Sequence, residues 1–256
     1  MLYVAAWLRH VLRSIYIRGR HNLTDRLEIT MHHASRPIVF DLDGTLIDSA
    51  PDIHACANKV LDQNNLTILS LPQVRSFIGG GVELLWSRII AALGIDAEKR
   101  PDLIDAFMAH YHQATELTAL FPGVIDALNR LADDGHPLGL CTNKPMQPTK
   151  AALAHFGLDV FMSTIVAGDT LPQMKPDPAP LRFALQQMGV TGYQQRALYI
   201  GDSEFDAYCA AAVPVPFLIY SGGYRNTAVS DLPHLHAFDH FNELPALVRA
   251  SVSPDI

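Results

Sequence analysis

From residue 37 onward, short apolar runs alternate with segments of helical periodicity, and this alternation limits the possible folds more than any other feature. Strands are predicted at PIVFD (37–41), PLGLCT (137–142), STIVAG (163–168), ALYIGD (197–202) and, as the last strand, VPFLIY (215–220). Helices are predicted between these runs at 123–135, 146–156, 178–189 and 204–212. Because strands joined by helical crossovers pair in parallel, the sequence predicts an α/β fold with a doubly wound, Rossmann-like parallel sheet.

One long interval interrupts this alternation. Residues 53–119 contain no convincing strand, and three segments there have helical periodicity: IHACANKVLDQNN, VELLWSRIIAALG and DLIDAFMAHYHQATEL. The simplest interpretation is an all-helical cap inserted after the first strand. The predicted regions are therefore an N-terminal extension (1–35), a catalytic core (36–52 and 120–256) and a helical cap (53–119). Two connections join cap and core, so the cap could open and close over the strand ends.

Polar side chains follow four of the predicted strands. Asp41 and Asp43 follow the first strand, and Thr142, Asn143 and Lys144 follow the second. The third leads to Lys175, and the fourth gives Asp202 with Asp206 one turn further on. Each cluster alone is ordinary, since an isolated DxD is usually a surface turn. Ligands bind at the carboxyl ends of strands in such sheets, so the joint placement predicts a functional site there.

Phosphoryl transfer is the chemistry that suits these residue types. Carboxylates at Asp41, Asp43 and Asp202 can attract Mg²⁺, which prefers oxygen ligands. The metal and Lys175 can offset the repulsion between a phosphate and the carboxylates, and the Thr142 hydroxyl can bind phosphate oxygens. An ionised aspartate can attack phosphorus and form an aspartyl-phosphate, while a second carboxyl group exchanges protons with the leaving group and water.

The motifs DLDGTLIDS, CTNKP, KPDPAPL and GDSEFDA, in that order, resemble those of the haloacid dehalogenase superfamily of phosphatases. The resemblance covers about residues 36–245, and the helical insert resembles the small helical cap of that family. In detail the motifs are most similar to those of phosphoglycolate phosphatases, including VRSFIGGGVELL in the cap and FPGV at the return to the core. The resemblance implies a Mg²⁺-dependent phosphatase.

The resemblance also implies roles for the acidic residues. Asp41 would be the nucleophile and a metal ligand. Asp43 would be the acid/base, with its backbone carbonyl on Mg²⁺. Asp202 would be a further metal ligand, and Asp206 would support Lys175 or a metal-bound water.

Residues from three segments would bind the substrate. Thr142, Asn143 and Lys175 would bind the phosphate group, and Lys175 would also contact the nucleophile. Arg75, in the cap, could bind a substrate carboxylate in bidentate fashion. The alternative for Arg75 is a solvated position on a helix face.

The favoured function is hydrolysis of a small phosphate monoester, with 2-phosphoglycolate as the leading substrate. Other cap-type phosphatases, pyrophosphatases, nucleotidases and sugar-phosphate mutases stay open as alternatives. Asp43 argues against a dehalogenase, because those relatives lack the second aspartate. A phosphate-responsive receiver-like module is the alternative without enzymatic activity, although receiver domains are shorter and lack a helical insert.

Composition limits the classes of binding partner and the cellular compartment that we expect for this protein. A net charge of −7 and a pI of about 5.9 argue against nucleic-acid binding. The cysteines at 56, 141 and 209 are far apart and form no CxxC pair, which favours a reducing, cytoplasmic location. No apolar run approaches about 18 residues, so no membrane span is expected. We expect a monomer or homodimer that binds a small phosphorylated metabolite.

Residues 1–30 are basic, in contrast to the acidic remainder. One interpretation is a helix that binds a membrane surface or a partner. The other, which we favour, is that residues 1–30 are not part of the native protein, because Met31 stands immediately before HHASRPIVFDLDGT. Either way, the fold and the site are expected to depend on the residues that follow.

Overall fold

The core of the computed structural model is a six-stranded sheet, and the structure describes residues 35–190 and 197–251. The prediction for residues 1–30 lies outside the described residues. All neighbouring strands of this sheet are parallel, in the order β5-β4-β1-β6-β7-β8. The strands are β1 (Ile38–Phe40), β4 (Leu138–Cys141), β5 (Met162–Val166), β6 (Leu198–Gly201), β7 (Phe217–Tyr220) and β8 (His236–Phe238). This topology confirms the predicted fold class.

Side chains alternate between the two faces of the central strands. Ile38 and Phe40 of β1 pack into one core cluster, whereas Val39 packs into the other. All three are fully buried. A strand that is covered on both faces has a continuous run of apolar residues. The run PIVF therefore predicted β1 correctly.

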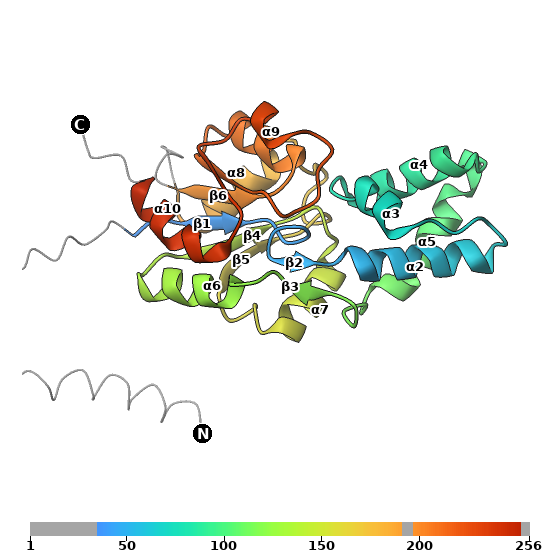
Figure 1. Cartoon of the computed structure of the whole chain (residues 1–256), viewed down its shortest axis with the longest axis horizontal. Coiled ribbons are helices and arrows are strands. Elements are labelled where there is room, and N and C mark those ends of the chain that lie inside the picture. Colours follow the sequence, from blue (N-terminus) through green and yellow to red (C-terminus); the bar gives the residue numbers. More distant parts are fainter. Residues whose placement is uncertain (1–34, 191–196, 252–256) are drawn as a thin grey trace, which may run out of the picture. The chain divides into compact units, whose positions relative to one another are not determined.

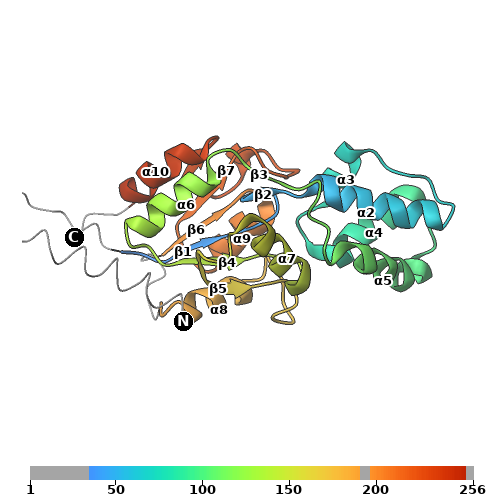
Figure 2. The same cartoon turned by 90° about the horizontal axis from the view of Figure 1, so that it is seen from below.

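Helices cover both faces of the sheet (Figures 1 and 2). The first cluster receives side chains from α6 (Val124–Asp133), α7 (Met146–Phe156) and α10 (Leu244–Ala250). The second receives them from α8 (Ala179–Gln187) and α9 (Glu204–Ala212). The four predicted crossover helices are therefore present, whereas α10 was not predicted.

Two expectations about strands are wrong. β7 is not the last strand, because β8 pairs with its outer edge. β8 has only three residues, and one of them, Ala237, is exposed, so it lacks an apolar run.

The interval 53–119 also ends in a strand residue. β3 (Ala119–Leu120) pairs with β2 (Ile47–Asp48) in a short antiparallel ladder where the two connections to the cap meet. Two-residue strands are too short to show a periodicity.

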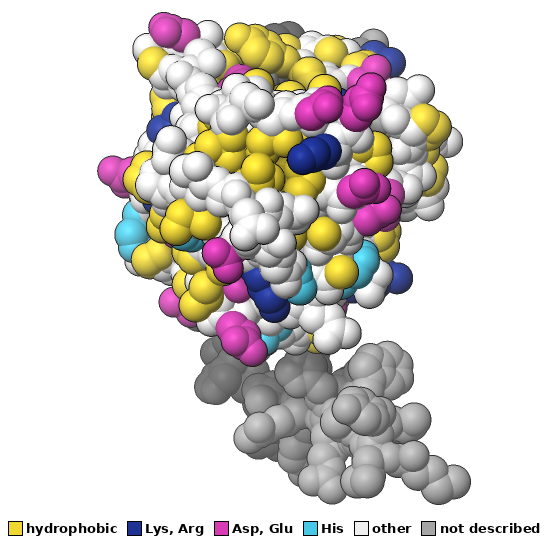
Figure 3. Space-filling view, turned by 90° about the vertical axis from the view of Figure 1, so that its right-hand side faces the viewer, with side chains coloured by type: hydrophobic (Ala, Val, Ile, Leu, Met, Phe, Trp, Pro, Cys, Tyr) yellow, Lys and Arg dark blue, Asp and Glu magenta, His cyan; other side chains and the backbone are white. Residues whose placement is uncertain are grey.

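The cap consists of α2 (Ala50–Gln63), α3 (Leu71–Phe77), α4 (Gly81–Leu93) and α5 (Arg100–Tyr111), with a short 3₁₀ turn before α5. These helices gather beyond the loops that follow the strands (Figures 1 and 2). They share their own core, in which the Trp86 and Phe107 rings meet edge to face at 5.9 Å. Seen from the cap end, hydrophobic, acidic and basic side chains are interspersed over the surface (Figure 3).

Within residues 35–190 and 197–251, no helix is both long enough and apolar enough to cross a membrane.

The separate core of the cap gives a test of its packing. Trp86 is fully buried, whereas Ile68 of the same cap is 60 % exposed. We expect Trp86→Ala to lower the free energy of unfolding by about 3–5 kcal/mol, because it leaves a large cavity. Ile68→Ala, the matched control, should cost less than about 0.5 kcal/mol. Urea unfolding followed by circular dichroism measures both, and a cost below about 1 kcal/mol for Trp86→Ala would contradict this packing.

Candidate active site

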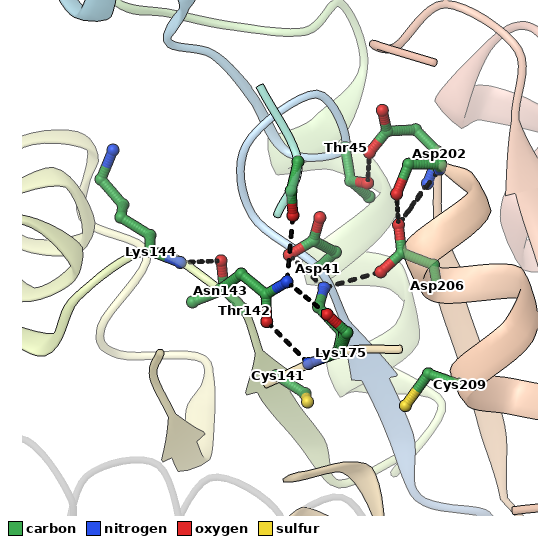
Figure 4. Close-up of polar contacts among 12 residues, drawn as sticks. Asp41, Thr45, Cys141, Thr142, Asn143, Lys144, Lys175, Asp202, Asp206 and Cys209 are labelled. Atoms are coloured by element: carbon green, nitrogen blue, oxygen red, sulfur yellow. Dashed lines mark hydrogen bonds and ion pairs between the residues drawn. The ribbon is translucent and has the colours of Figure 1, made fainter. Parts of the chain in front are cut away.

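Backbone hydrogen bonds at the sheet edge bring several of the predicted site residues together. Figure 4 shows Asp41, Thr142, Asn143, Lys175, Asp202 and Asp206 close to one another. The Asp41 N–H donates to the carbonyl of Ile200 at 2.8 Å, which fixes Asp41 beside the end of β6. The Thr142 N–H donates to the carbonyl of Val166 at 2.9 Å, which fixes Thr142 beside the end of β5. The side chains that follow β1, β4 and β6 therefore converge because the strands end in register.

Lys175 lies at the centre of the buried part of the site. Its Nζ is 2.8 Å from Asp41 Oδ1 and 2.6 Å from Asp206 Oδ1, and it donates to the Tyr199 hydroxyl at 3.0 Å. The side chain is 2 % exposed. Burial alone would lower the pKa of Lys175, but the carboxylates of Asp206 and Asp41 outweigh it and raise the pKa above its ordinary value. The lysine therefore carries its charge in the folded protein.

Asp206 is held by many donors. Its Oδ1 accepts from Lys175 and from the Tyr199 hydroxyl, and its Oδ2 accepts from the Ser203 hydroxyl at 2.7 Å and from the backbone N–H groups of residues 202 and 203. Burial by itself would raise the pKa of Asp206, but Lys175 and the hydroxyls lower it below the ordinary value. Tyr199 was not predicted, since a tyrosine inside an apolar strand carries no signal of a polar role.

The loop after β1 packs closely against the carboxylate of Asp202. Asp202 Oδ1 accepts from the Thr45 hydroxyl at 2.7 Å, and Asp202 Oδ2 accepts from the Tyr224 N–H at 2.6 Å. Gly44 has φ of +88°, and a Cβ there would lie 2.5 Å from Asp202 Oδ2. The glycine of the DLDGT motif therefore allows the first loop to approach the Asp202 carboxylate.

The acidic residues have more negative charge than Lys175 neutralises. Oxygens of Asp41, Asp202 and Asp206, all buried, lie within 4.8 Å of one another. Burial raises the pKa of Asp41 to about 7, with Asp206 and Asp43 adding to the rise and Lys175 opposing it. Burial, Asp206 and Asp41 likewise raise the pKa of Asp202 well above its ordinary value. A cation would relieve this repulsion, and a set of carboxylate oxygens suits a hard cation such as Mg²⁺. The residues therefore fit a divalent cation.

Asp43 lies apart from that cluster and has its own partners. Its Oδ1 accepts from the Ser49 hydroxyl at 2.5 Å and is 3.0 Å from Lys144 Nζ. Lys144 is 2 % exposed and also donates to the hydroxyl of Tyr111, at the end of α5. Burial raises the pKa of Tyr111 well above its ordinary value, so this hydroxyl stays neutral. Neither Lys144 nor Tyr111 received a predicted role, although Lys144 lies within the CTNKP motif.

A pocket lies between the strand ends and the cap. On the core side its polar lining comes from Asp41, Asp43, Thr142, Asn143 and Lys144, and the Gly79–Gly81 loop and Tyr111 contribute from the cap. The apolar lining comes from the cap residues Ile53, Ile78, Val82, Leu85 and Phe107. The loop FIGGGVELL thus reaches the pocket, and α4 begins within it at Gly81.

The side-chain amide of Asn143 forms hydrogen bonds with backbone groups. Its Nδ2 donates to the carbonyls of Gly79 (3.0 Å) and Lys175 (2.9 Å), and its Oδ1 accepts from the Lys175 N–H at 2.9 Å. Asn143 therefore connects the cap loop to the segment that carries Lys175. A contact with substrate remains a prediction for this residue.

Arg75 lies where β2 meets the cap. It forms an ion pair with Asp48 at 3.1 Å, and its guanidinium lies 5.4 Å from the centre of the Tyr224 ring. Arg75 is not among the residues that line the pocket. Its predicted contact with a substrate carboxylate also remains a prediction.

Comparisons of the sequence and of the structure with known proteins both identify haloacid dehalogenase-like hydrolases. Residues 38–220 match the family of haloacid dehalogenase-like hydrolases. The chain is 44 % identical over 215 residues to a phosphoglycolate phosphatase of Cereibacter sphaeroides strain ATCC 17025, covering 83 % of this chain and 97 % of that one. It is 43 % identical over 216 residues to a phosphoglycolate phosphatase of Rhodobacter capsulatus, covering 83 % and 96 %. The crystal structure of a predicted phosphoglycolate phosphatase from Haemophilus somnus 129PT superimposes with a TM-score of 0.79 at 28 % identity, covering 84 % and 98 %.

The chain therefore belongs to the haloacid dehalogenase-like hydrolase family. Within that family it is an enzyme of the phosphatase class.

The charge balance around Lys175 can be tested by removing its ammonium group. We expect Lys175→Met to lower the free energy of unfolding at pH 8 by about 3–5 kcal/mol, because buried carboxylates lose their partner. The loss should be smaller at pH 5, because the pKa of Asp41, already raised, rises further without the lysine and the group becomes neutral. Lys150→Met, which changes an exposed lysine of α7, is the matched control. A loss below about 1 kcal/mol in urea unfolding at pH 8 would contradict the account.

Proposed function

We propose that this protein is a Mg²⁺-dependent phosphatase that hydrolyses 2-phosphoglycolate to glycolate and phosphate through an aspartyl-phosphate. The observation that carries the proposal is the buried cluster of Asp41, Asp202 and Asp206 around Lys175, at the strand ends beneath the capped pocket. Relatives that share 39–44 % of their residues with this chain are named phosphoglycolate phosphatases, which supports the choice of substrate. The monomeric or dimeric state and the cytoplasmic location remain predictions.

In this proposal Asp41 is the nucleophile. It lies in the pocket lining, and its contact with Lys175 orients the carboxylate. Mg²⁺, when bound by Asp41, Asp202 and the Asp43 carbonyl, would supply charge neutralisation for the carboxylates and the phosphate. A nearby cation also favours the ionised form of Asp41, the form that can attack phosphorus. Asp206 is so fully hydrogen-bonded that its proposed role is to hold Lys175.

Asp43 is proposed to exchange protons with the leaving group and the attacking water. Its side chain is 12 % exposed and lies in the pocket lining, two residues after the nucleophile. Contact with the pocket gives it access to the ester oxygen, and a carboxyl group suits general acid/base catalysis. The Thr142 hydroxyl, whose oxygen accepts from the Lys144 N–H at 3.2 Å, can donate its proton to a phosphate oxygen.

The nucleophile assignment is tested by Asp41→Asn. An amide cannot form the phosphoenzyme and is a weaker Mg²⁺ ligand, so kcat should fall at least about 10³-fold. No acid-stable or trapped phosphoenzyme should form from ³²P-labelled substrate. Asp159→Asn, which changes an exposed carboxylate, is the control and should keep wild-type kcat. If Asp41→Asn kept about a tenth of wild-type kcat, Asp41 would not be the nucleophile.

The acid/base assignment predicts a dependence on the leaving group. Asp43→Asn should slow phosphorylation of the enzyme by roughly 10²–10⁴-fold with an alkyl phosphate. The loss should be much smaller with p-nitrophenyl phosphate, whose leaving group needs no proton. Single-turnover phosphorylation measures both rates, and equal losses for the two esters would argue against this role.

The raised pKa values predict that protons compete with the metal. Asp41, with a pKa of about 7, is mostly protonated at pH 6 and mostly ionised at pH 8. Binding of Mg²⁺ at pH 6 must release a proton, so the apparent Kd should be at least about 10-fold weaker at pH 6 than at pH 8. Isothermal titration calorimetry at the two pH values measures this shift. Equal Kd values would mean either that the pKa of Asp41 is not raised in the metal-free protein or that Asp41 is not a ligand.

A further inference from the structure

Lys144 is a buried cation that the proposed chemistry does not use. Its Nζ is 3.0 Å from Asp43 Oδ1 and lies 4.5 Å from the centre of the Tyr111 ring. Lys175 is committed to Asp41 and Asp206 on the other side of the site. A second buried ammonium group costs desolvation energy unless a partner compensates it, and Asp43 is the carboxylate in contact with it.

The pocket makes Lys144 accessible to a ligand. Among the residues that line it, in the described part of the chain, Lys144 is the only lysine or arginine. The opposite wall is apolar cap surface, where a charged ligand group finds no favourable contact. Lys144 is therefore the cationic side chain that an anionic group of a bound ligand can contact in the described pocket lining, and the neutral Tyr111 hydroxyl lies beside it.

The distance from Asp43 to Lys144 restricts the length of such a ligand. Asp43 is proposed to contact the ester oxygen, and Lys144 lies 3.0 Å from the same carboxylate. With bonds of about 1.5 Å, a carboxylate bonded directly to the ester carbon has its oxygens about 3 Å from the ester oxygen. A short hydroxy-acid phosphate can thus reach both groups at once.

We propose that Lys144, oriented by Tyr111, binds the negatively charged group on the leaving-group side of the substrate and selects short phosphorylated hydroxy acids over neutral phosphoesters. This inference rests on the proposed function and specifies which residue recognises the substrate acid. It assigns the substrate carboxylate to Lys144, which lines the pocket, rather than to Arg75, which does not.

Two substrates of similar size isolate the effect of charge. 2-Phosphoglycolate and 2-hydroxyethyl phosphate differ in the carboxylate and share the phosphate ester. In Lys144→Met, the ratio of their kcat/KM values should fall at least about 30-fold, mostly through KM for the acid, because a buried charge-assisted contact is lost. Lys144→Gln, which retains hydrogen bonding to Asp43 and Tyr111 without the charge, should give the same loss, and it carries the test if the Met variant does not fold by circular dichroism.

Control variants separate this role from others. Lys150→Met removes an exposed lysine from α7 and should leave the ratio unchanged. A Lys144 that acts only by holding Asp43 or the fold would slow both substrates by one factor, and that result would overturn the inference. A collapse of the ratio in Arg75→Met, with a normal ratio in Lys144→Met, would also overturn it.

The proposed function is judged by the wild-type enzyme. Turnover of 2-phosphoglycolate by the wild type tests that function alone. An active wild type whose ratio does not change in the Lys144 variants overturns only the role of Lys144. A wild type that prefers the neutral ester overturns both.

Discussion

The contact of one buried ammonium group with two buried carboxylates is the interaction on which the site depends. Lys175 neutralises part of the charge of Asp41 and Asp206, and the Asp202 carboxylate adds to the remainder. Burial and the excess negative charge together raise the pKa of Asp41 and Asp202, and the unneutralised charge favours binding of a cation at the strand ends. A parallel sheet makes this arrangement possible, because it delivers the ends of β1, β4 and β6 to one edge and covers both faces with helices.

The cap completes the site from the other side. Its own core makes it a packed body, while Asn143 connects its Gly79 carbonyl to the segment of Lys175. In the proposed account, the apolar cap wall and the Lys144–Tyr111 contact separate the leaving-group end of the pocket from the phosphate end. Exclusion of water by such a wall strengthens the electrostatic interactions inside the pocket. In this account, the core supplies the chemistry and the meeting of cap and core supplies the selectivity.

The sequence predicted the parts that depend on local patterns. Apolar runs such as PIVF identify strands covered on both faces, and the polar residues after them identify the edge where Asp41, Thr142 and Asp202 meet. β8 was missed because three residues with one exposed side chain show no periodicity. The contacts of Lys144 were not predicted because its partners are 33 and 101 positions away, and no local pattern encodes such contacts. Tyr199 looked like an apolar strand residue for the same reason: its hydrogen bond to Asp206 depends on how β6 meets α9.

A crystal structure grown with Mg²⁺ and beryllium fluoride tests the central claim most directly, because this mixture mimics the phosphoryl group on an aspartate. The account predicts beryllium fluoride bonded to Asp41, one metal ion ligated by Asp41 and Asp202, and Lys175 still in contact with Asp206. A metal ion bound elsewhere, or beryllium fluoride on another residue, would contradict the claim that the charge imbalance around Lys175 builds the catalytic centre.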